Sequence, residues 1–165
     1  MFPEILYVMA EDLLETCRAQ NLKLALAESC TGGLIAGCIT SVAGSSAVFE
    51  RGFITYTNQS KGEMLGVPPL IFMTNGSVSE ECARAMAEGA LEHSAAQISL
   101  SVTGIAGPGG GTVDKPVGLV HLACARAGFE TRHQRHVFKG DRERVRIQTV
   151  ESGLKLLLNC CAVDG

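Results

Sequence analysis

The sequence contains no tryptophan and only two tyrosines, and its 165 residues carry a net charge of only −3. Dedicated nucleic-acid-binding domains usually present a basic face and aromatic side chains that stack on bases, so this composition argues against such a role. No apolar run approaches the roughly 20 residues that a membrane span needs. We also expect no signal peptide, because Glu4 stands where such a peptide carries positive charge. We therefore expect a soluble cytoplasmic protein with no nucleic-acid or membrane partner.

Paired cysteine spacings are missing as well. The chain has seven cysteines, an odd number, and no two of them stand in a C-x-x-C pattern. Neither a disulfide framework nor a paired-thiol zinc site fits this distribution. Most of the cysteines are therefore expected to be small apolar core residues in a reducing compartment.

The hydrophobic pattern alternates between helix and strand along the first part of the chain. Apolar residues recur at helical spacing from Ile5 to Cys17, and the apolar stretch at 22–29 then predicts a buried strand. The same reasoning predicts helices at 31–39, 60–66, 79–93 and after Asp141, and strands at 49–58, 97–104, 117–125 and 130–138. This order predicts an α/β fold: a single three-layer α/β/α domain over residues 1–165, with a mixed, mostly parallel sheet.

The first candidate site is the stretch ESCTGG at residues 28–33, where a predicted strand turns into a helix. A nucleophile such as Ser29 would be exposed there at the carboxyl edge of the sheet, and the following backbone N–H groups could face a developing oxyanion. From this segment alone, a helix cap formed by Ser29 or Thr31 is the commoner explanation.

Lys61 ends the second candidate, the stretch YTNQSK at residues 56–61. A lysine acts as a general base only if burial or nearby positive charge lowers its pKa from about 10.4 towards roughly 7 to 8. A place at the start of a helix would itself help, because the helix dipole disfavours positive charge there. Taken alone, an ordinary surface lysine is the commoner explanation.

Two further stretches could bind an anion. Five glycines at residues 104–111 match neither a Walker A loop nor a dinucleotide fingerprint, so they form either a cradle of backbone N–H groups or a flexible connection. The stretch GDRERVR at 140–146 places three arginines against the dipole of the last helix, which indicates an anion site or a solvated face. Arg142, in the first turn, is our candidate for a ligand contact. No histidine stands near the Gly-rich turns to support a Ser-His-Asp triad.

Together these segments resemble one family, the C-terminal domain of the competence/damage-inducible protein CinA. The resemblance covers residues 4–160, and the matching motifs are AESCTGG (27–33), Tyr56-x-Asn58-x-x-Lys61, TGIAGPGGGT with KPVG (103–118) and GDRERVR (140–146). Each motif alone is weak, but four in order at matching separations are highly specific. Many relatives carry an additional molybdopterin-binding-like domain that has no counterpart here, so we expect none of the activities tied to that domain.

The stand-alone form of this family is nicotinamide-nucleotide amidase. The resemblance therefore implies hydrolysis of the carboxamide of nicotinamide mononucleotide (NMN) to nicotinate mononucleotide and ammonia, a step of pyridine-nucleotide salvage. It also implies a Ser-Lys mechanism with Ser29 as nucleophile, Lys61 as base and Tyr56 in an assisting role. The substrate-binding positions that it implies are Cys30, Thr31, Gly32, Gly33, Asn58, Thr103, Gly104, Gly107, Gly109 and Arg142.

The implied chemistry needs neither a cofactor nor a metal, because the cationic pyridinium ring already withdraws electrons from the amide. Phosphate recognition would fall to the Gly-rich loop and Arg142. Two alternatives stay open: a non-catalytic nucleotide-binding module that uses the same loops, and an amidase in which Cys30 is the nucleophile. The sequence leaves the oligomeric state open, with a homo-oligomer among the options.

Overall fold

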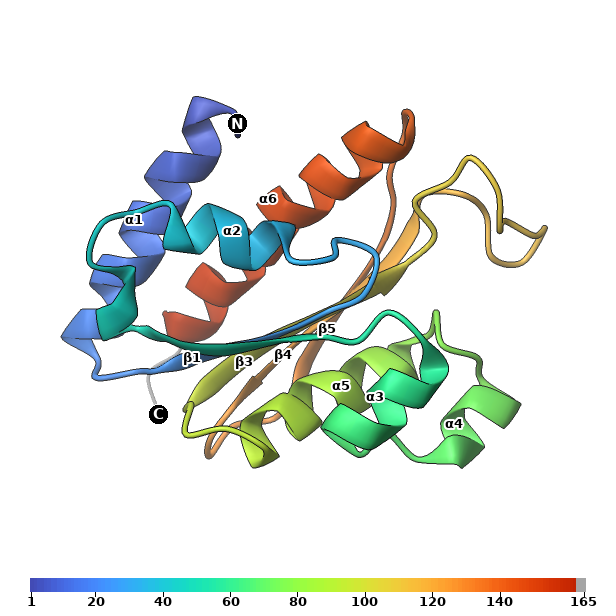
Figure 1. Ribbon diagram of the computed structural model, residues 1–165, viewed down its shortest axis with the longest axis horizontal. Coiled ribbons are helices and arrows are strands. Elements are labelled where there is room, and N and C mark those ends of the chain that lie inside the picture. The colour runs from blue at the N-terminus through green and yellow to red at the C-terminus, as the bar shows by residue number, and fades with distance from the viewer. Residues whose placement is uncertain (163–165) are drawn as a thin grey trace.

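The structure, a computed structural model, describes residues 1–162; residues 163–165 of the predicted domain lie outside the described part. A five-stranded sheet forms the middle of three layers (Figure 1). Its strands, in spatial order, are β2 (Phe49–Ile54), β1 (Leu24–Glu28), β3 (Ile98–Gly104), β4 (Leu119–Arg126) and β5 (Arg132–Val137). One face is covered by α1 (Glu4–Ala19), α2 (Leu34–Thr40) and α6 (Arg142–Cys161), and the other by α3 (Asn58–Leu65), α4 (Pro69–Thr74) and α5 (Glu80–Glu92).

The strand directions confirm the predicted three-layer α/β/α fold with a mixed sheet. β1 pairs in parallel with both β2 and β3, while β4 pairs antiparallel with both β3 and β5. Among the described strands, all but β4 therefore run in the same direction. The parallel part of the sheet is covered on both faces, which is why β1 is buried along its whole length.

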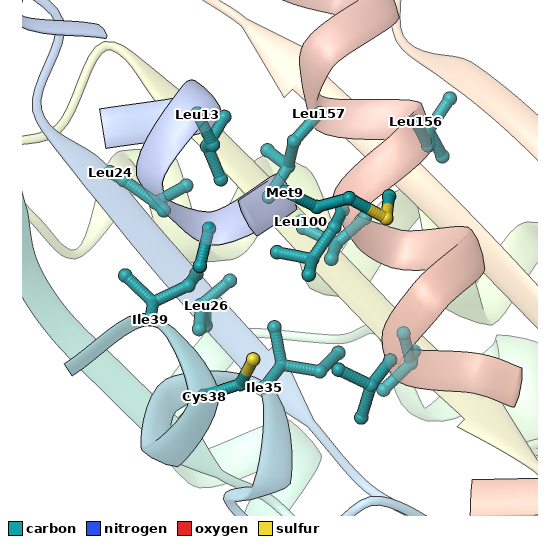
Figure 2. Close-up of a cluster of buried hydrophobic side chains, with 14 of the residues drawn as sticks. Met9, Leu13, Leu24, Leu26, Ile35, Cys38, Ile39, Leu100, Leu156 and Leu157 are labelled. Carbon is teal, nitrogen blue, oxygen red and sulfur yellow. The ribbon is translucent and has the colours of Figure 1, made fainter. Parts of the chain in front are cut away.

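The larger core cluster lies between the sheet and the helices α1, α2 and α6 (Figure 2). Leu24 and Leu26 of β1 point into it, whereas the alternating residues Ala25 and Ala27 pack towards α5. All seven cysteines are buried and free, as expected of small core residues. Among the described residues, no helix is both long and apolar enough to cross a membrane.

Three hydroxyl groups on β3 form hydrogen bonds to α5 and to the loop before α5. Ser99 Oγ donates to the carbonyl of Ala87 at 2.6 Å, and Ser101 Oγ donates to the carbonyl of Ala83 at 2.5 Å. Thr103 Oγ1 donates to the carbonyl of Ser77 at 2.8 Å. Because residues two apart share a face of a strand, this series fixes where α5 lies along the sheet.

Several boundaries differ from the prediction: the strand predicted at 49–58 ends at Ile54, and the helix predicted at 60–66 already begins at Asn58. The helix expected from residue 31 begins at Leu34, because Gly33 adopts a left-handed φ of 103° and ends a turn at 31–33. A short helix that was not predicted, α4, follows α3: Pro68 is its N-cap residue and Pro69 its first residue. A proline is tolerated there because the first turn of a helix needs no N–H donor.

Candidate active site

The parallel strands β1, β2 and β3 end at the same edge of the sheet. Glu28 at the end of β1 is in register with Ile54 of β2 and Val102 of β3. The backbone N–H of Ser29 donates to the carbonyl of Val102 at 3.0 Å, which continues this pairing one residue further. The segments that follow the three strands therefore meet around Ser29.

Lys61 reaches Ser29 from α3. The N-terminus of α3 is fixed by a capping box in which Thr57 and Ser60 bond each other's backbone N–H groups. Lys61 follows directly, and its Nζ lies 3.0 Å from Ser29 Oγ, 2.8 Å from the carbonyl oxygen of Thr55 and 3.3 Å from that of Tyr56. The predicted nucleophile and base are thus in hydrogen-bonding contact.

The Lys61 amine is isolated from solvent. Only 1% of the residue is exposed, and Ser29 is 8% exposed. Burial lowers the pKa of Lys61 below its usual value, and it outweighs the opposing effect of Cys82 and Cys30. A lysine of this kind holds a larger neutral fraction than a surface lysine and can accept a proton from a hydroxyl.

The turn after Ser29 leaves several backbone N–H groups unused. The Gly32 N–H donates to the carbonyl of Ser29 at 3.0 Å, but the N–H groups of Cys30, Thr31 and Gly33 have no backbone partner among the described residues. Donors fixed next to a nucleophile can stabilise negative charge on a carbonyl oxygen. This arrangement fits the predicted oxyanion-stabilising role of the turn.

Glu28 supports this turn from inside the protein. Its carboxylate is 1% exposed and accepts three hydrogen bonds: from Thr31 Oγ1 at 2.6 Å and from the N–H groups of Ile35 and Ala36 at 3.0 Å each. The acid therefore takes the place of a side-chain cap for α2, which has none at its N-cap residue. Sequence reasoning assigned no role to Glu28.

We expect Glu28→Gln to lower the free energy of unfolding by about 2–3 kcal/mol, because a carboxamide cannot accept hydrogen bonds on both sides and would leave a buried donor unpaired. Urea denaturation followed by circular dichroism measures this effect. Glu92→Gln, which changes an exposed carboxylate on α5, is the matched control. A loss no larger than that of the control would contradict the capping role.

Arg142 connects two other predicted elements of the site. Its Nη1 donates to the carbonyl of Gly107 at 2.8 Å, and its Nη2 donates to the hydroxyl of Tyr56 at 3.0 Å. Gly107 adopts a left-handed φ of 84°, and a Cβ there would lie against Val117, so only glycine suits this position of the loop. The guanidinium group thereby joins the start of α6, the Gly-rich loop and Tyr56 at the mouth of the site.

A cavity of about 250 Å³ lies where these groups meet. It is lined by Ser29, Cys30, Tyr56, Lys61, Ser77, Val78, Thr103, Gly104, Ile105, Ala106, Gly107, Gly109, Gly110 and Arg142. The charged groups in this lining are Lys61 and Arg142, and it contains no carboxylate. The cavity is therefore suited to an anionic ligand.

Most of the predicted site residues line this cavity, but four do not. Thr31 is fully buried beneath the turn, where its hydroxyl bonds Glu28, and Asn58 is exposed at the start of α3. Gly32 and Gly33 lie in the turn outside the lining. A substrate contact by any of these four residues stays a prediction.

Ser77 and Val78 also line the cavity, although they were not among the predicted site residues. They directly precede the N-cap residue of α5, Ser79, whose Oγ accepts a hydrogen bond from the N–H of Cys82. The hydrogen bond from Thr103 holds Ser77 in place. No sequence signal marks this loop as part of the site, because its position depends on the packing of α5 against β3.

A larger groove of about 530 Å³ runs along β5 and the C-terminal half of α6. Its lining includes the thiols of Cys124 and Cys160 and the guanidinium group of Arg132. No hydroxyl in it contacts a buried base as Ser29 contacts Lys61. The smaller cavity is therefore the candidate active site.

Comparison with known proteins supports a common ancestry along the whole chain. Residues 6–161 match the family profile described as the CinA C-terminal domain. A "CinA-like protein" of Geobacter sp. (strain M21) is 52% identical over 158 residues, which cover 92% of this chain and 38% of that protein. The chain thus spans well under half the length of such curated relatives.

Solved structures give the same result. The crystal structure of the competence/damage inducible protein CihA from Agrobacterium tumefaciens matches with a TM-score of 0.95 and 45% identity, covering 96% of this chain and 97% of that one. A CinA superfamily protein from Klebsiella pneumoniae 700603 matches with a TM-score of 0.91 and 30% identity, covering 95% and 98%. The resemblance inferred from four short motifs is confirmed, and the chain belongs to the CinA C-terminal domain family.

Proposed function

We propose that this domain is an amidase that hydrolyses the carboxamide of NMN to nicotinate mononucleotide and ammonia, with Ser29 as nucleophile and Lys61 as general base. The observation that carries the proposal is the 3.0 Å contact between Ser29 Oγ and a buried lysine amine whose pKa is lowered. We place the reaction in the cytoplasm, since free thiols such as these seven persist in reducing compartments.

In the first half of the reaction, Lys61 takes the proton of Ser29 while Oγ attacks the carboxamide carbon. The carbonyl oxygen gains negative charge, which the N–H groups of the turn after Ser29 can stabilise, at about 3–4 kcal/mol for one donor. As the tetrahedral intermediate collapses, the C–N bond breaks and Lys61 returns the proton to the leaving nitrogen. Ammonia departs, and an ester between Ser29 and the nicotinoyl group remains.

In the second half, a water molecule occupies the place of ammonia. Lys61 takes one proton from this water as its oxygen attacks the ester carbon, and then gives the proton back to Ser29 Oγ. Nicotinate mononucleotide leaves and the free enzyme is restored. Each half uses the same two side chains, which is the behaviour expected of a single nucleophile and base pair.

The choice of NMN as substrate rests on the resemblance of the motifs and on the charge of the cavity. Arg142 gives the cavity positive charge even when Lys61 is neutral, and glycines of the Gly-rich loop line the cavity. A phosphate group at the mouth would meet Arg142, while the amide would reach Ser29 at the inner end. The positively charged pyridinium ring of NMN activates the amide for attack.

Ammonia release from NMN, nicotinamide riboside and nicotinamide tests the proposal directly. We expect NMN to be hydrolysed with the highest kcat/KM and free nicotinamide with the lowest. Binding of NMN without any release of ammonia would instead favour a non-catalytic nucleotide-binding module. Hydrolysis of all three compounds at equal kcat/KM would exclude a role for the phosphate.

Arg142→Ala should raise KM for NMN on the order of tenfold to a hundredfold, because a charge-assisted hydrogen bond to the phosphate is lost. KM for nicotinamide riboside, which has no phosphate, should change much less. Steady-state kinetics with both substrates measures the difference, and Arg144→Ala, an exposed arginine of the same helix, is the control. Equal effects on both substrates would show that Arg142 acts only by holding Tyr56 and Gly107.

A further inference from the structure

Arg146, the last arginine of the GDRERVR stretch, binds the backbone of the turn that follows Ser29. Its Nε donates to the carbonyl of Cys30 at 3.1 Å, and its Nη2 donates to the carbonyl of Thr31 at 3.0 Å. One planar guanidinium group thus holds two successive carbonyl groups of a segment more than 100 residues away. Arg146 does not line the cavity, and among the described residues its side chain forms no hydrogen bond to Ser29 or Lys61.

Holding these carbonyl groups also fixes the N–H groups of the same peptide units. In a planar trans peptide the C=O and the following N–H point in opposite directions. When Arg146 binds the carbonyl of Cys30, the Thr31 N–H is therefore directed away from Arg146. When it binds the carbonyl of Thr31, it directs the Gly32 N–H, which donates to the carbonyl of Ser29.

The hydrogen bond from the Gly32 N–H to the Ser29 carbonyl also fixes the orientation of the peptide unit that follows Ser29. The carbonyl of Ser29 belongs to the same peptide unit as the N–H of Cys30, so its orientation sets the direction of this N–H. Cys30 lines the cavity beside Ser29, and its N–H has no backbone partner. Arg146 therefore orients the N–H groups of both Cys30 and Thr31 through two adjacent peptide units.

The turn is held from its other side by the buried Glu28. Its carboxylate accepts hydrogen bonds from the Thr31 hydroxyl and from the N–H groups of Ile35 and Ala36 in α2. These donors are therefore not free to bind a ligand in place of the N–H groups of the turn. Arg146 binds carbonyl groups only, so it leaves the N–H groups of Cys30 and Thr31 available. Glu28 and Arg146 together hold the turn in one conformation before any substrate arrives.

We propose that Arg146 is a positioning residue that preorganises the oxyanion-stabilising N–H groups of Cys30 and Thr31. This inference rests on the proposed amidase function. A guanidinium group suits the task because its fixed, planar donors match two neighbouring acceptors, whereas a lysine amine offers a single flexible point of charge. Preorganised donors act on the transition state more than on the bound substrate, so the effect falls on kcat.

Kinetics of Arg146→Ala and Arg146→Lys on NMN provide the first test, with Arg144→Ala as the control on the same helix. We expect kcat to fall by about tenfold to a hundredfold in both Arg146 variants, with KM changed by no more than about twofold. Arg146→Lys keeps the charge and covers the case in which Arg146→Ala folds poorly, as judged by its melting temperature. Full activity in Arg146→Lys, or a rise of KM at constant kcat, would overturn the proposal.

A second test does not depend on the identity of the natural substrate. An alkyl fluorophosphonate reacts when Ser29 Oγ bonds to phosphorus, fluoride leaves and the Ser29 proton passes to Lys61, with the phosphoryl oxygen in the position of the oxyanion. Intact-protein mass spectrometry follows this labelling. We expect labelling of Arg146→Ala and Arg146→Lys to be slower by at least about tenfold, and that of Arg144→Ala to be unchanged.

The two tests separate the positioning role from the amidase proposal. Slow labelling of the Arg146 variants in a protein that releases no ammonia from NMN would support the positioning role while the proposed substrate fails. Ammonia release and labelling at wild-type rates in both Arg146 variants would refute the positioning role and leave the amidase function standing.

Discussion

Ser29→Ala should reduce ammonia release from NMN by about four to six orders of magnitude, because the covalent route is lost with the nucleophile. Cys30→Ala should keep most of the activity. Burial raises the pKa of the Cys30 thiol to about 12, so the thiol is protonated at neutral pH and is a poor nucleophile. A coupled assay measures the rate of ammonia release, and a high concentration of the Ser29→Ala variant makes its low expected rate measurable.

The same pair of variants decides between the two candidate nucleophiles. Intact-protein mass spectrometry after fluorophosphonate treatment should show one added group in wild type and Cys30→Ala, and none in Ser29→Ala. Substantial activity in Ser29→Ala, or a loss found only in Cys30→Ala, would assign the nucleophile to the thiol. Thr31→Ser, which keeps the hydroxyl that bonds Glu28, controls for disturbance of the turn.

Replacement of Lys61 should reduce ammonia release from NMN nearly as much as Ser29→Ala does. Neutral Lys61 is the active form of the base, so kcat/KM should rise with pH until the amine is deprotonated in the free enzyme. Because burial lowers the pKa of Lys61, this rise should end below the usual lysine pKa of about 10.4. Initial rates between pH 6 and 10, with the enzyme's stability checked at each pH, measure the profile.

Lys61→Arg separates a base from a fixed positive charge. Arginine keeps the charge but does not deprotonate in this pH range, so Lys61→Arg should lose activity by at least about a thousandfold, much like Lys61→Ala. A lysine that acted only through its charge would give the opposite result, in which arginine preserves activity and alanine does not. Substantial activity of Lys61→Arg with an unchanged pH profile would disprove the general-base role and leave the role of Ser29 intact.

The main elements of the fold follow from local patterns. The capped helix α5, the hairpin of β4 and β5, and the last helix capped by Asp141 all carry their signals within a few residues. The start of α2 at Leu34 was missed, because glycine in a left-handed turn cannot be distinguished by sequence from glycine inside a helix. The helix α4 has no buried residue of its own, so it left no amphipathic pattern to detect.

The candidate site could be predicted only in part, because its contacts cross the fold. Ser29 and Lys61 each had an ordinary explanation in isolation, and only the order of all the motifs suggested that they meet. Arg146 acts through hydrogen bonds to two carbonyl groups, and carbonyl groups are the same at every residue of a sequence. Its role is therefore visible only where α6 and the turn after Ser29 lie side by side.

The series of hydroxyl groups on β3 has a consequence for engineering the specificity of this domain. Ser99 and Ser101 hydrogen-bond carbonyl groups within α5, while Val67, Ile71 and Phe72 pack against this helix from the segment before it. The exposed positions of the chain between α3 and Ser77 could then be varied without moving α5, provided that these three apolar residues are kept. Libraries confined to the exposed residues 68–70, 73 and 74 should therefore yield a high share of folded proteins, and they would vary the surface next to Ser77 and Val78, which line the cavity.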